Sequence, residues 1–159
     1  MEFITSFESP VGFLILKSDG QSVTEINFSE SDYPDQNCCA VLENCKIQLE
    51  NYFSGRAFRF DLLLGPEGTE FQQKVWAELL KIPFGETITY MELAVRLGDA
   101  KAIRAVGTAN GRNPIAIIIP CHRVIGAGNK LIGYAGGIWR KKALLELEMK
   151  YNPNKQTLF

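Results

Sequence analysis

The stretch that decides the fold is residues 117–124, Ile-Ile-Ile-Pro-Cys-His-Arg-Val, in which a thiol and an imidazole follow an apolar run. The apolar residues predict a buried strand over 115–119. Pro120 has no N–H and cannot continue a sheet ladder, so the strand should end there. We therefore expect Cys121 and His122 at the end of a sheet. Neighbours in an extended chain point to opposite faces, so a water molecule should connect the two side chains.

Cys121 and His122 together predict a nucleophile and its helper base. A free thiol has a pKa of about 8.5 and is only a few per cent thiolate at neutral pH, so a nearby base is the usual means of activation. An inert buried cysteine beside a hydrogen-bonded histidine is the alternative. A cysteine hydrolase is another, although the members of a catalytic triad are neighbours in space rather than in sequence.

The composition is that of a globular protein: 159 residues, of which 46% are hydrophobic and 22% charged. No apolar run approaches the roughly 20 residues that span a bilayer, and no signal-peptide pattern precedes the first strand. We therefore expect a cytoplasmic protein, nuclear in a eukaryote, with no membrane partner. Four cysteines and one histidine make no zinc-ligand spacing, so we expect reduced thiols, no metal and no cofactor.

The net charge is only −1, but the charges are segregated along the chain. Residues 1–66 contain ten acidic and four basic side chains, whereas residues 83–143 contain nine basic and three acidic ones. A basic region of this kind is typical of a surface that meets a phosphate backbone. A solvated basic surface without a partner is the alternative that charge alone leaves open.

The first part of the chain is rich in β-branched and aromatic residues and predicts a small α/β domain. The expected elements are strands at 3–7, 11–17, 23–28 and 58–62 and a helix at 40–53. The best linker in the chain is 64–68, Leu-Gly-Pro-Glu-Gly. We place the domain boundary there, with an N-terminal domain at 1–66, a C-terminal domain at 67–151 and a flexible tail at 152–159.

The second part should be mainly helical. Helices are expected at 70–81, 90–97, 100–109 and 138–150. Thr89 and Glu92 form a capping-box pattern at the start of the second of these. Residues 97–99, Leu-Gly-Asp, join two short helices into a helix-turn-helix, whose second helix typically enters a DNA groove. That helix carries Lys101 and Arg104, so a transcription regulator is one function that the motif permits.

Five motifs, in order, resemble the O6-alkylguanine-DNA alkyltransferases, also called methylated-DNA–protein-cysteine methyltransferases. They are FGETITY at 84–90, RAVG at 104–107, NP at 113–114, IPCHRV at 119–124 and YAGG at 134–137. The resemblance runs from about Phe71 to Glu148; the first third is similar only in being strand-rich with one helix. It implies an α/β (α+β) fold, with a ribonuclease H-like N-terminal domain and a winged helix-turn-helix C-terminal domain whose short sheet carries the cysteine motif.

The resemblance also implies direct-reversal repair of double-stranded DNA that contains alkylated bases. In this family a cysteine takes an alkyl group from O6 of guanine, and less readily from O4 of thymine. A thiolate suits in-line attack on saturated carbon, and water does not hydrolyse the thioether that results. Cys121 should therefore act once, as a suicide enzyme, in a monomer. A lesion-binding module of the alkyltransferase-like type is the alternative, and because such modules replace the cysteine, Cys121 argues against it.

Position in the family motifs assigns further catalytic roles. Glu148 should orient His122, giving a Cys–water–His–Glu chain. Tyr90 should donate to the purine ring, and Asn113 should tie the helix-turn-helix to the cysteine loop. A base inside a duplex must be rotated out of the stack before it can react. Arg104 matches the arginine that fills the vacated space, with a phosphate contact as its alternative role.

Two further groups of residues complete the expected site. The DNA-binding residues are Thr89, Tyr90, Lys101, Arg104, Arg112 and Arg123. The walls of the base pocket are Val124, Tyr134, Ala135, Gly136 and Gly137. Ala135 stands where some relatives have serine, so only a backbone donor remains at that position.

The tail contains a second, weaker resemblance. Residues 155–159, Lys-Gln-Thr-Leu-Phe, faintly resemble the peptides that dock on replication sliding clamps. Such a contact would be weak, and a frayed terminus is the alternative.

Overall fold

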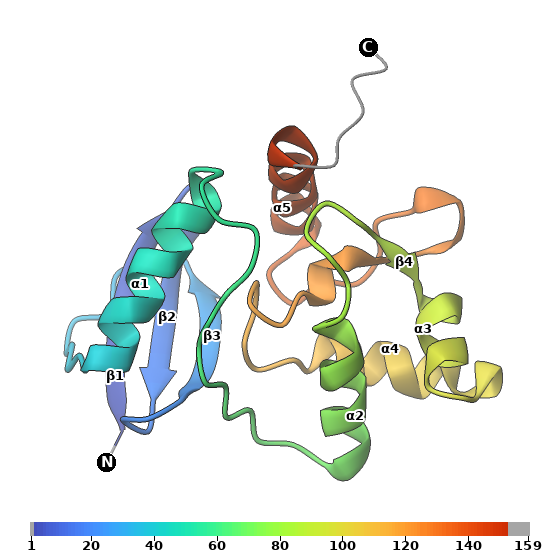
Figure 1. The fold of residues 1–159 in the computed structure, drawn as a ribbon, viewed down its shortest axis with the longest axis horizontal. Coiled ribbons are helices and arrows are strands. Elements are labelled where there is room, and N and C mark those ends of the chain that lie inside the picture. The colour runs from blue at the N-terminus through green and yellow to red at the C-terminus, as the bar shows by residue number, and fades with distance from the viewer. Residues whose placement is uncertain (1, 153–159) are drawn as a thin grey trace.

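The computed structural model describes residues 2–152. Its N-terminal half is an antiparallel sheet with one helix against it (Figure 1). Strands β1 (Phe3–Ser9), β2 (Gly12–Ser18) and β3 (Val23–Ser29) pair in the order β1-β2-β3, and α1 (Ala40–Phe53) packs on the sheet. Leu14 and Leu16 of the central strand are fully buried, as the period of two predicts. The first three of the four expected strands and the helix are therefore confirmed.

The outer edge of this sheet, β3, is joined to a segment from much later in the chain. Ile26 forms a parallel bridge with Ile115. Its N–H donates to Pro114 O at 2.9 Å, and its carbonyl accepts from the N–H of Ala116 at 3.1 Å. Backbone hydrogen bonds thus connect the N-terminal sheet directly to the segment that leads to Cys121.

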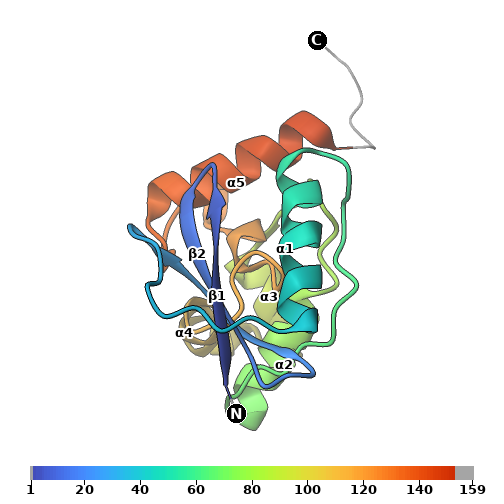
Figure 2. The ribbon, with the colours of Figure 1, turned by 90° about the vertical axis from the view of Figure 1, so that its left-hand side faces the viewer.

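The C-terminal half is helical apart from one short sheet. Its elements are α2 (Glu70–Leu79), α3 (Tyr90–Arg96), α4 (Ile103–Gly111), α5 (Ile138–Tyr151) and the parallel pair β4 (Ile88–Thr89) and β5 (Val124–Ile125). The Thr89 side chain caps α3 by accepting from Glu92 N at 3.0 Å. A 3₁₀ turn at Ala100–Ala102 leads into α4, so the expected pair of short helices is present. Helix α5 contacts both halves and runs across one end of the molecule (Figure 2).

The expected strand at 58–62 is wrong, because these described residues form bends and coil. Their apolar side chains pack between the two halves instead of alternating across a sheet. The rings of Phe58 and Phe84 lie 5.0 Å apart, and those of Phe60 and Tyr52 lie 5.5 Å apart, between centroids. The alternation of apolar and charged residues at 58–62 therefore reflects two separate ring contacts, Phe58 with Phe84 and Phe60 with Tyr52, rather than the two faces of a strand.

The expected strand at 115–119 is also wrong, since only Ile115 pairs and the residues after it fold into turns. Asn113 explains the difference. Its amide oxygen accepts from Ile115 N at 2.9 Å and its amide nitrogen donates to Ile119 O at 2.7 Å, which closes the segment into a loop. Within this loop Ile117 has a φ of 72°, a conformation that a β-branched residue rarely adopts.

Cys121 consequently lies on a 3₁₀ turn, Cys121–Arg123, rather than at the end of a strand. The expected alternation of Cys121 and His122 to opposite faces of a strand does not apply, because the backbone there is not extended. Strand β5 begins directly after the turn, so the short β4–β5 sheet does carry the cysteine motif.

The last helix, α5, ends at Tyr151. Residues 153–159, which include the clamp-like peptide and most of the expected tail, lie outside the described residues. Within the described part of the chain, no helix is long and apolar enough to cross a membrane.

Candidate active site

Cys121 is the nucleophile candidate and is buried, with 7% of its surface exposed. Burial raises the pKa of its thiol, while a hydrogen bond with Asn113 and the charge of Lys141 act in the opposite direction. Asn113 also closes the loop before Cys121, so the loop residue that the family motif indicates does contact the cysteine segment. The thiol is therefore protonated at neutral pH in the unbound chain, while Asn113 and Lys141 favour its thiolate form.

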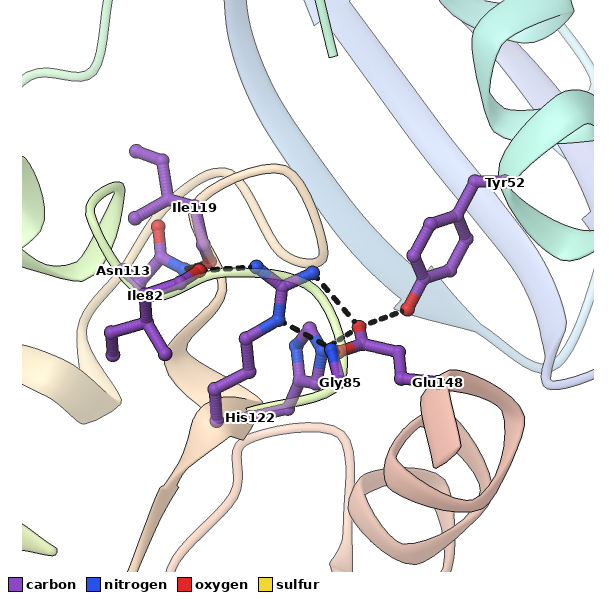
Figure 3. A network of polar contacts seen from close by, with 8 residues as sticks. Tyr52, Ile82, Gly85, Asn113, Ile119, His122 and Glu148 are labelled. Carbon is purple, nitrogen blue, oxygen red and sulfur yellow. Dashed lines mark hydrogen bonds and ion pairs between the residues drawn. The ribbon is translucent and has the colours of Figure 1, made fainter. Parts of the chain in front are cut away.

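The Glu148 carboxylate is the centre of a buried polar network (Figure 3). His122 Nε2 lies 2.6 Å from Oε2, and the Tyr52 hydroxyl donates to Oε2 at 2.5 Å. Arg123 donates to Oε1 at 2.7 Å and to Oε2 at 3.1 Å, and Gly85 N donates to Oε1 at 3.2 Å. One carboxylate thus gathers α1, the loop before β4, the 3₁₀ turn and α5, and the expected His122–Glu148 pair is present.

This network determines the protonation of the imidazole. Burial alone would raise the pKa of Glu148, but the charges and hydrogen bonds of His122 and Arg123 outweigh it and hold the pKa well below the usual range. Burial lowers the pKa of His122, against the effect of Glu148, so the ring is neutral at neutral pH. Because Glu148 accepts at Nε2, that nitrogen carries the proton and Nδ1 is the basic one. Nδ1 is buried and has no hydrogen-bond partner among the described residues.

A cavity of about 170 Å³ lies beside Cys121 and is lined by three of the five residues expected in the base pocket, Tyr134, Ala135 and Gly136. Residues 134–136, in the loop before α5, form one wall, and Phe28 of β3 forms part of another. Two residues expected in this wall are placed elsewhere. Gly137 is the N-cap of α5, with a φ of 92°, and Val124 is fully buried in β5.

Tyr90 and Arg104 border a second hollow, of about 400 Å³, on the face formed by α3 and α4. Gly133 borders both this hollow and the cavity at Cys121, so the two adjoin. Tyr90 donates its hydroxyl hydrogen to Ile132 O at 3.0 Å. Gly107 faces the same tyrosine, and a Cβ there would lie 3.8 Å from the ring.

The four basic residues expected to contact DNA fall into two groups. Those exposed on or near α4 are Lys101, Arg104 and Arg112. Arg123, by contrast, is buried; it donates to Ile82 O at 2.7 Å and pairs with Glu148. The Glu148 carboxylate holds the Arg123 guanidinium inside the molecule, away from the surface on which Lys101, Arg104 and Arg112 are exposed.

Lys141 is a buried cation that sequence analysis did not place in the site. Its ammonium donates to Ile132 O at 2.9 Å and lies 3.5 Å from the Tyr90 hydroxyl. Burial lowers its pKa to about 8, and the nearby Cys121 acts in the opposite direction. In the sequence it is the middle of three consecutive basic residues, 140–142, and only the helical phase of α5 could have marked it as inward-facing.

Tyr52 is a second residue that sequence analysis missed. The periodicity of 40–53 assigns it only to the apolar face of a helix. In the structure its ring is buried and its hydroxyl reaches Glu148, 96 positions later. Such a partner leaves no local signal in the sequence.

Comparison with known proteins agrees with this architecture. Models of the 6-O-methylguanine DNA methyltransferase family match the ribonuclease-like domain over residues 3–66 and the DNA binding domain over residues 70–150. The chain belongs to this family. The curated methylated-DNA–protein-cysteine methyltransferase of Methanosarcina acetivorans is 50% identical over 148 residues, which cover 89% of this chain and 95% of that protein.

Solved structures of relatives extend the comparison to the fold. A crystal structure of Mycobacterium tuberculosis O6-methylguanine methyltransferase aligns with a TM-score of 0.87 and 47% identity, covering 100% of this chain and 99% of that one. The M. tuberculosis OGT in complex with DNA aligns with a TM-score of 0.85 and 48% identity, covering 94% of each chain. The α/β fold is therefore that of the family, and the chain is a DNA-binding enzyme of direct-reversal repair.

Proposed function

We propose that Cys121 accepts an alkyl group from O6 of guanine, and less readily from O4 of thymine, in double-stranded DNA. The thiolate sulfur attacks the alkyl carbon in line, a carbon–sulfur bond forms, and the carbon–oxygen bond breaks. The electron pair of the broken bond stays with the base. The base takes up a proton and remains in the DNA in its unmodified form. The observation that carries this proposal is the neutral His122, held by Glu148, whose Nδ1 is left free to take the thiol proton.

The proton of the thiol passes through a water molecule to His122 Nδ1. Glu148 supports this step in two ways: it fixes the tautomer, and it stabilises the imidazolium that forms. Arg123 keeps the Glu148 carboxylate ionised, so the network is complete before the reaction starts. Asn113 and Lys141 add to the stability of the thiolate.

The base pocket supplies polar groups for the purine. Tyr134 Oη is buried without a hydrogen-bond partner among the described residues, so it is available to a bound base. Glycine at 136 lets the backbone approach the ligand closely. Tyr90 is the proposed donor to the departing purine; its hydroxyl hydrogen, donated to Ile132 O in the unbound chain, turns to the base, and Lys141 remains as a donor to Ile132 O.

The alkylated nucleotide reaches Cys121 by rotating out of the duplex, at a cost of a few kcal/mol. Arg104 is exposed at the start of α4 and borders the hollow that adjoins the cavity at Gly133. Its side chain fills the gap in the base stack that the rotated nucleotide leaves. Lys101 and Arg112, exposed near the two ends of the same helix, then contact phosphates and set the position of α4 on the DNA.

The product is a thioether, which water does not hydrolyse, and the proposed mechanism has no step that would regenerate the thiol. Each chain, acting as a monomer, therefore repairs one lesion. The number of lesions repaired should equal the number of active chains, without turnover.

Mass spectrometry of the protein after incubation with a duplex that contains one O6-methylguanine tests the proposal. We expect one added methyl group on the peptide that contains Cys121, together with unmodified guanine in the DNA. Cys121→Ala should abolish transfer. The matched control is Cys45→Ala, because Cys45 is buried in the sheet half and burial raises its pKa to about 12. An unmodified Cys121 in a protein that binds the lesion would favour the binding module instead.

The role of Arg104 needs a separate test. Arg104→Ala should slow transfer from duplex DNA much more than transfer from a single strand, in which no stack has to be opened. Arg96→Ala, an exposed arginine in the last turn of α3, is the control. A uniform loss of affinity for duplex and single strand, with a salt slope reduced by about one, would make Arg104 a phosphate contact only.

A further inference from the structure

We propose that Phe28, in the N-terminal sheet, is a specificity-determining residue that limits the size of the alkyl group transferred to Cys121. The inference rests on the proposed function, because it requires Cys121 to be the acceptor. It also gives the N-terminal half a direct part in substrate selection, in addition to its contact with Glu148.

Phe28 lies in the wall of the cavity that contains Cys121. Its ring centroid is 5.8 Å from that of Tyr134, with 59° between the ring planes. On the adjacent stretch of wall, a Cβ at Gly136 would come within 2.6 Å of the Phe28 ring. The ring therefore fills the space that any side chain at position 136 would need, and it closes this side of the pocket.

The backbone fixes Phe28 in this place. The bridge between Ile26 and Ile115 sets the position of β3 against the loop that leads to Cys121. Side chains two residues apart in a strand share a face, so Phe28 projects on the same side as Ile26. Ile26 also lines the cavity and is 1% exposed. The register of β3 thus places the Phe28 ring in the wall of the cavity at Cys121.

Arg140, from α5, holds this wall together. Its guanidinium carbon lies 5.1 Å from the Phe28 ring centroid, and its Nη1 donates to Gly136 O at 3.1 Å. The same side chain donates to Val11 O at 2.7 Å and to Glu30 Oε1 at 2.9 Å. Arg140 is only 6% exposed, so it joins the pocket loop to the N-terminal sheet from within the structure.

Because the cavity is small, the position of this wall limits the size of the alkyl group that fits. At about 170 Å³ it is smaller than the roughly 300–1,000 Å³ typical of ligand pockets, so each additional alkyl carbon requires a wall to move. Tyr134 and Gly136 belong to the loop assigned to the base. Phe28 comes from the other half and is outside the Glu148 network, so its size can be changed without replacing or contacting His122 or Glu148.

The test compares the second-order rates of transfer from duplexes that contain O6-methylguanine or O6-benzylguanine, for the wild type, Phe28→Ala and Phe28→Leu. We expect the ratio of benzyl to methyl transfer to rise roughly tenfold or more in Phe28→Ala and less in Phe28→Leu, because alkyl carbons in an apolar pocket change specificity by about this factor. The matched control is Phe7→Ala, since Phe7 is a half-buried strand aromatic that stacks on Phe53 at 6.3 Å, away from the cavity. Its ratio should not change.

The outcomes separate this proposal from the function on which it rests. If wild-type protein transfers no methyl group to Cys121, the proposed function fails. If methyl transfer to Cys121 is normal and both rates fall equally in Phe28→Ala, or if Phe7→Ala raises the ratio as much, Phe28 has only a structural role and this inference is overturned. If Phe28→Ala does not fold, Phe28→Leu provides the same comparison with a smaller change in volume.

Discussion

His122 Nε2 lies 2.6 Å from Glu148 Oε2, and the two side chains are 0% and 1% exposed. A carboxylate buried to this extent is stable only when its oxygens are well supplied with donors, and Glu148 has them from Tyr52, Gly85 and Arg123 as well. The imidazole is therefore one of several groups that depend on a single acceptor. Changes at Glu148 should affect folding and reaction together.

Glu148→Gln should reduce both activity and stability. The neutral amide no longer fixes the tautomer of His122 or stabilises its charged form, so we expect transfer to slow by about 100-fold or more. The buried Arg123 loses its counter-charge, and the free energy of unfolding should fall by about 3–5 kcal/mol. Single-turnover kinetics and urea unfolding measure the two effects.

Tyr52→Phe is the matched change at the same carboxylate. It removes one hydrogen bond to Glu148 and leaves the ion pairs in place, so unfolding should become easier by about 2 kcal/mol. Transfer should slow by less than tenfold. A loss of activity as large as that of Glu148→Gln would show that Tyr52 acts in the reaction and not only in joining the halves.

The single histidine gives the pH dependence of stability a clear assignment. Burial lowers the pKa of His122 in the folded state, so between its folded pKa and the ordinary value of about 6.5 the unfolded chain binds more protons. Stability should therefore decrease as pH falls below about 6.5, by up to about 1.4 kcal/mol per pH unit. Urea unfolding from about pH 7 to about pH 5 measures this slope.

His122→Gln removes the titrating group and keeps a donor for Glu148. The slope below about pH 6.5 should disappear in this variant. The loss of stability due to Glu148, whose folded pKa is also lowered, should remain, because it starts only near the ordinary glutamate pKa of 4.5. If stability still decreases in His122→Gln between about pH 6.5 and about pH 4.5, the effect belongs to another group.

Lys141→Met should slow transfer at neutral pH and shift the rate–pH profile towards higher pH. The charge of Lys141 favours the thiolate of Cys121, and one unit of thiol pKa corresponds to about a tenfold change in rate. The gap between variant and wild type should narrow above pH 8, because the pKa of Lys141 is lowered to about 8 and the wild-type amine then loses its charge. Lys142→Met, at the exposed neighbouring position, should leave the profile unchanged. A uniform loss of rate at every pH would limit Lys141 to a packing role.

Thr89→Ala should destabilise the protein by about 1 kcal/mol, because the hydroxyl caps α3. Thr87→Ala, two positions earlier and exposed, should change the free energy of unfolding by less than about 0.5 kcal/mol. Urea unfolding gives both values. If the two variants behave alike, the capping box contributes nothing measurable to the helix pair.

Local patterns predicted the elements whose cause is local. The helix expected at 40–53 has the same bounds in the structure, and β1 to β3 begin and end within two residues of their expected limits, because alternation and turn residues act over a few positions. The capping box expected at Thr89 is present for the same reason. The Cys121 and His122 pair was found because the two residues are adjacent.

Features with long-range causes could not be predicted from local patterns, and the His122–Glu148 pair was expected only because the motifs resemble the family. A basic side chain in a basic region is normally on the surface, yet Arg123, Arg140 and Lys141 are buried. Their acceptors come from the other half or from another segment, such as Val11 for Arg140. The loop at 115–119 is similar, because its apolar composition fits a strand while the Asn113 side chain closes it into turns. Sequence spacing contains no information about such partners.

Glu148 lies in the last helix, while Cys121 and His122 precede it by more than 25 positions. During synthesis the thiol proposed as the acceptor therefore leaves the ribosome before the carboxylate proposed to orient its base. A product that terminates between these positions has the cysteine but lacks the group that fixes the imidazole tautomer. Under the proposed mechanism, the chain should therefore become reactive towards alkylated DNA only after α5 has been translated.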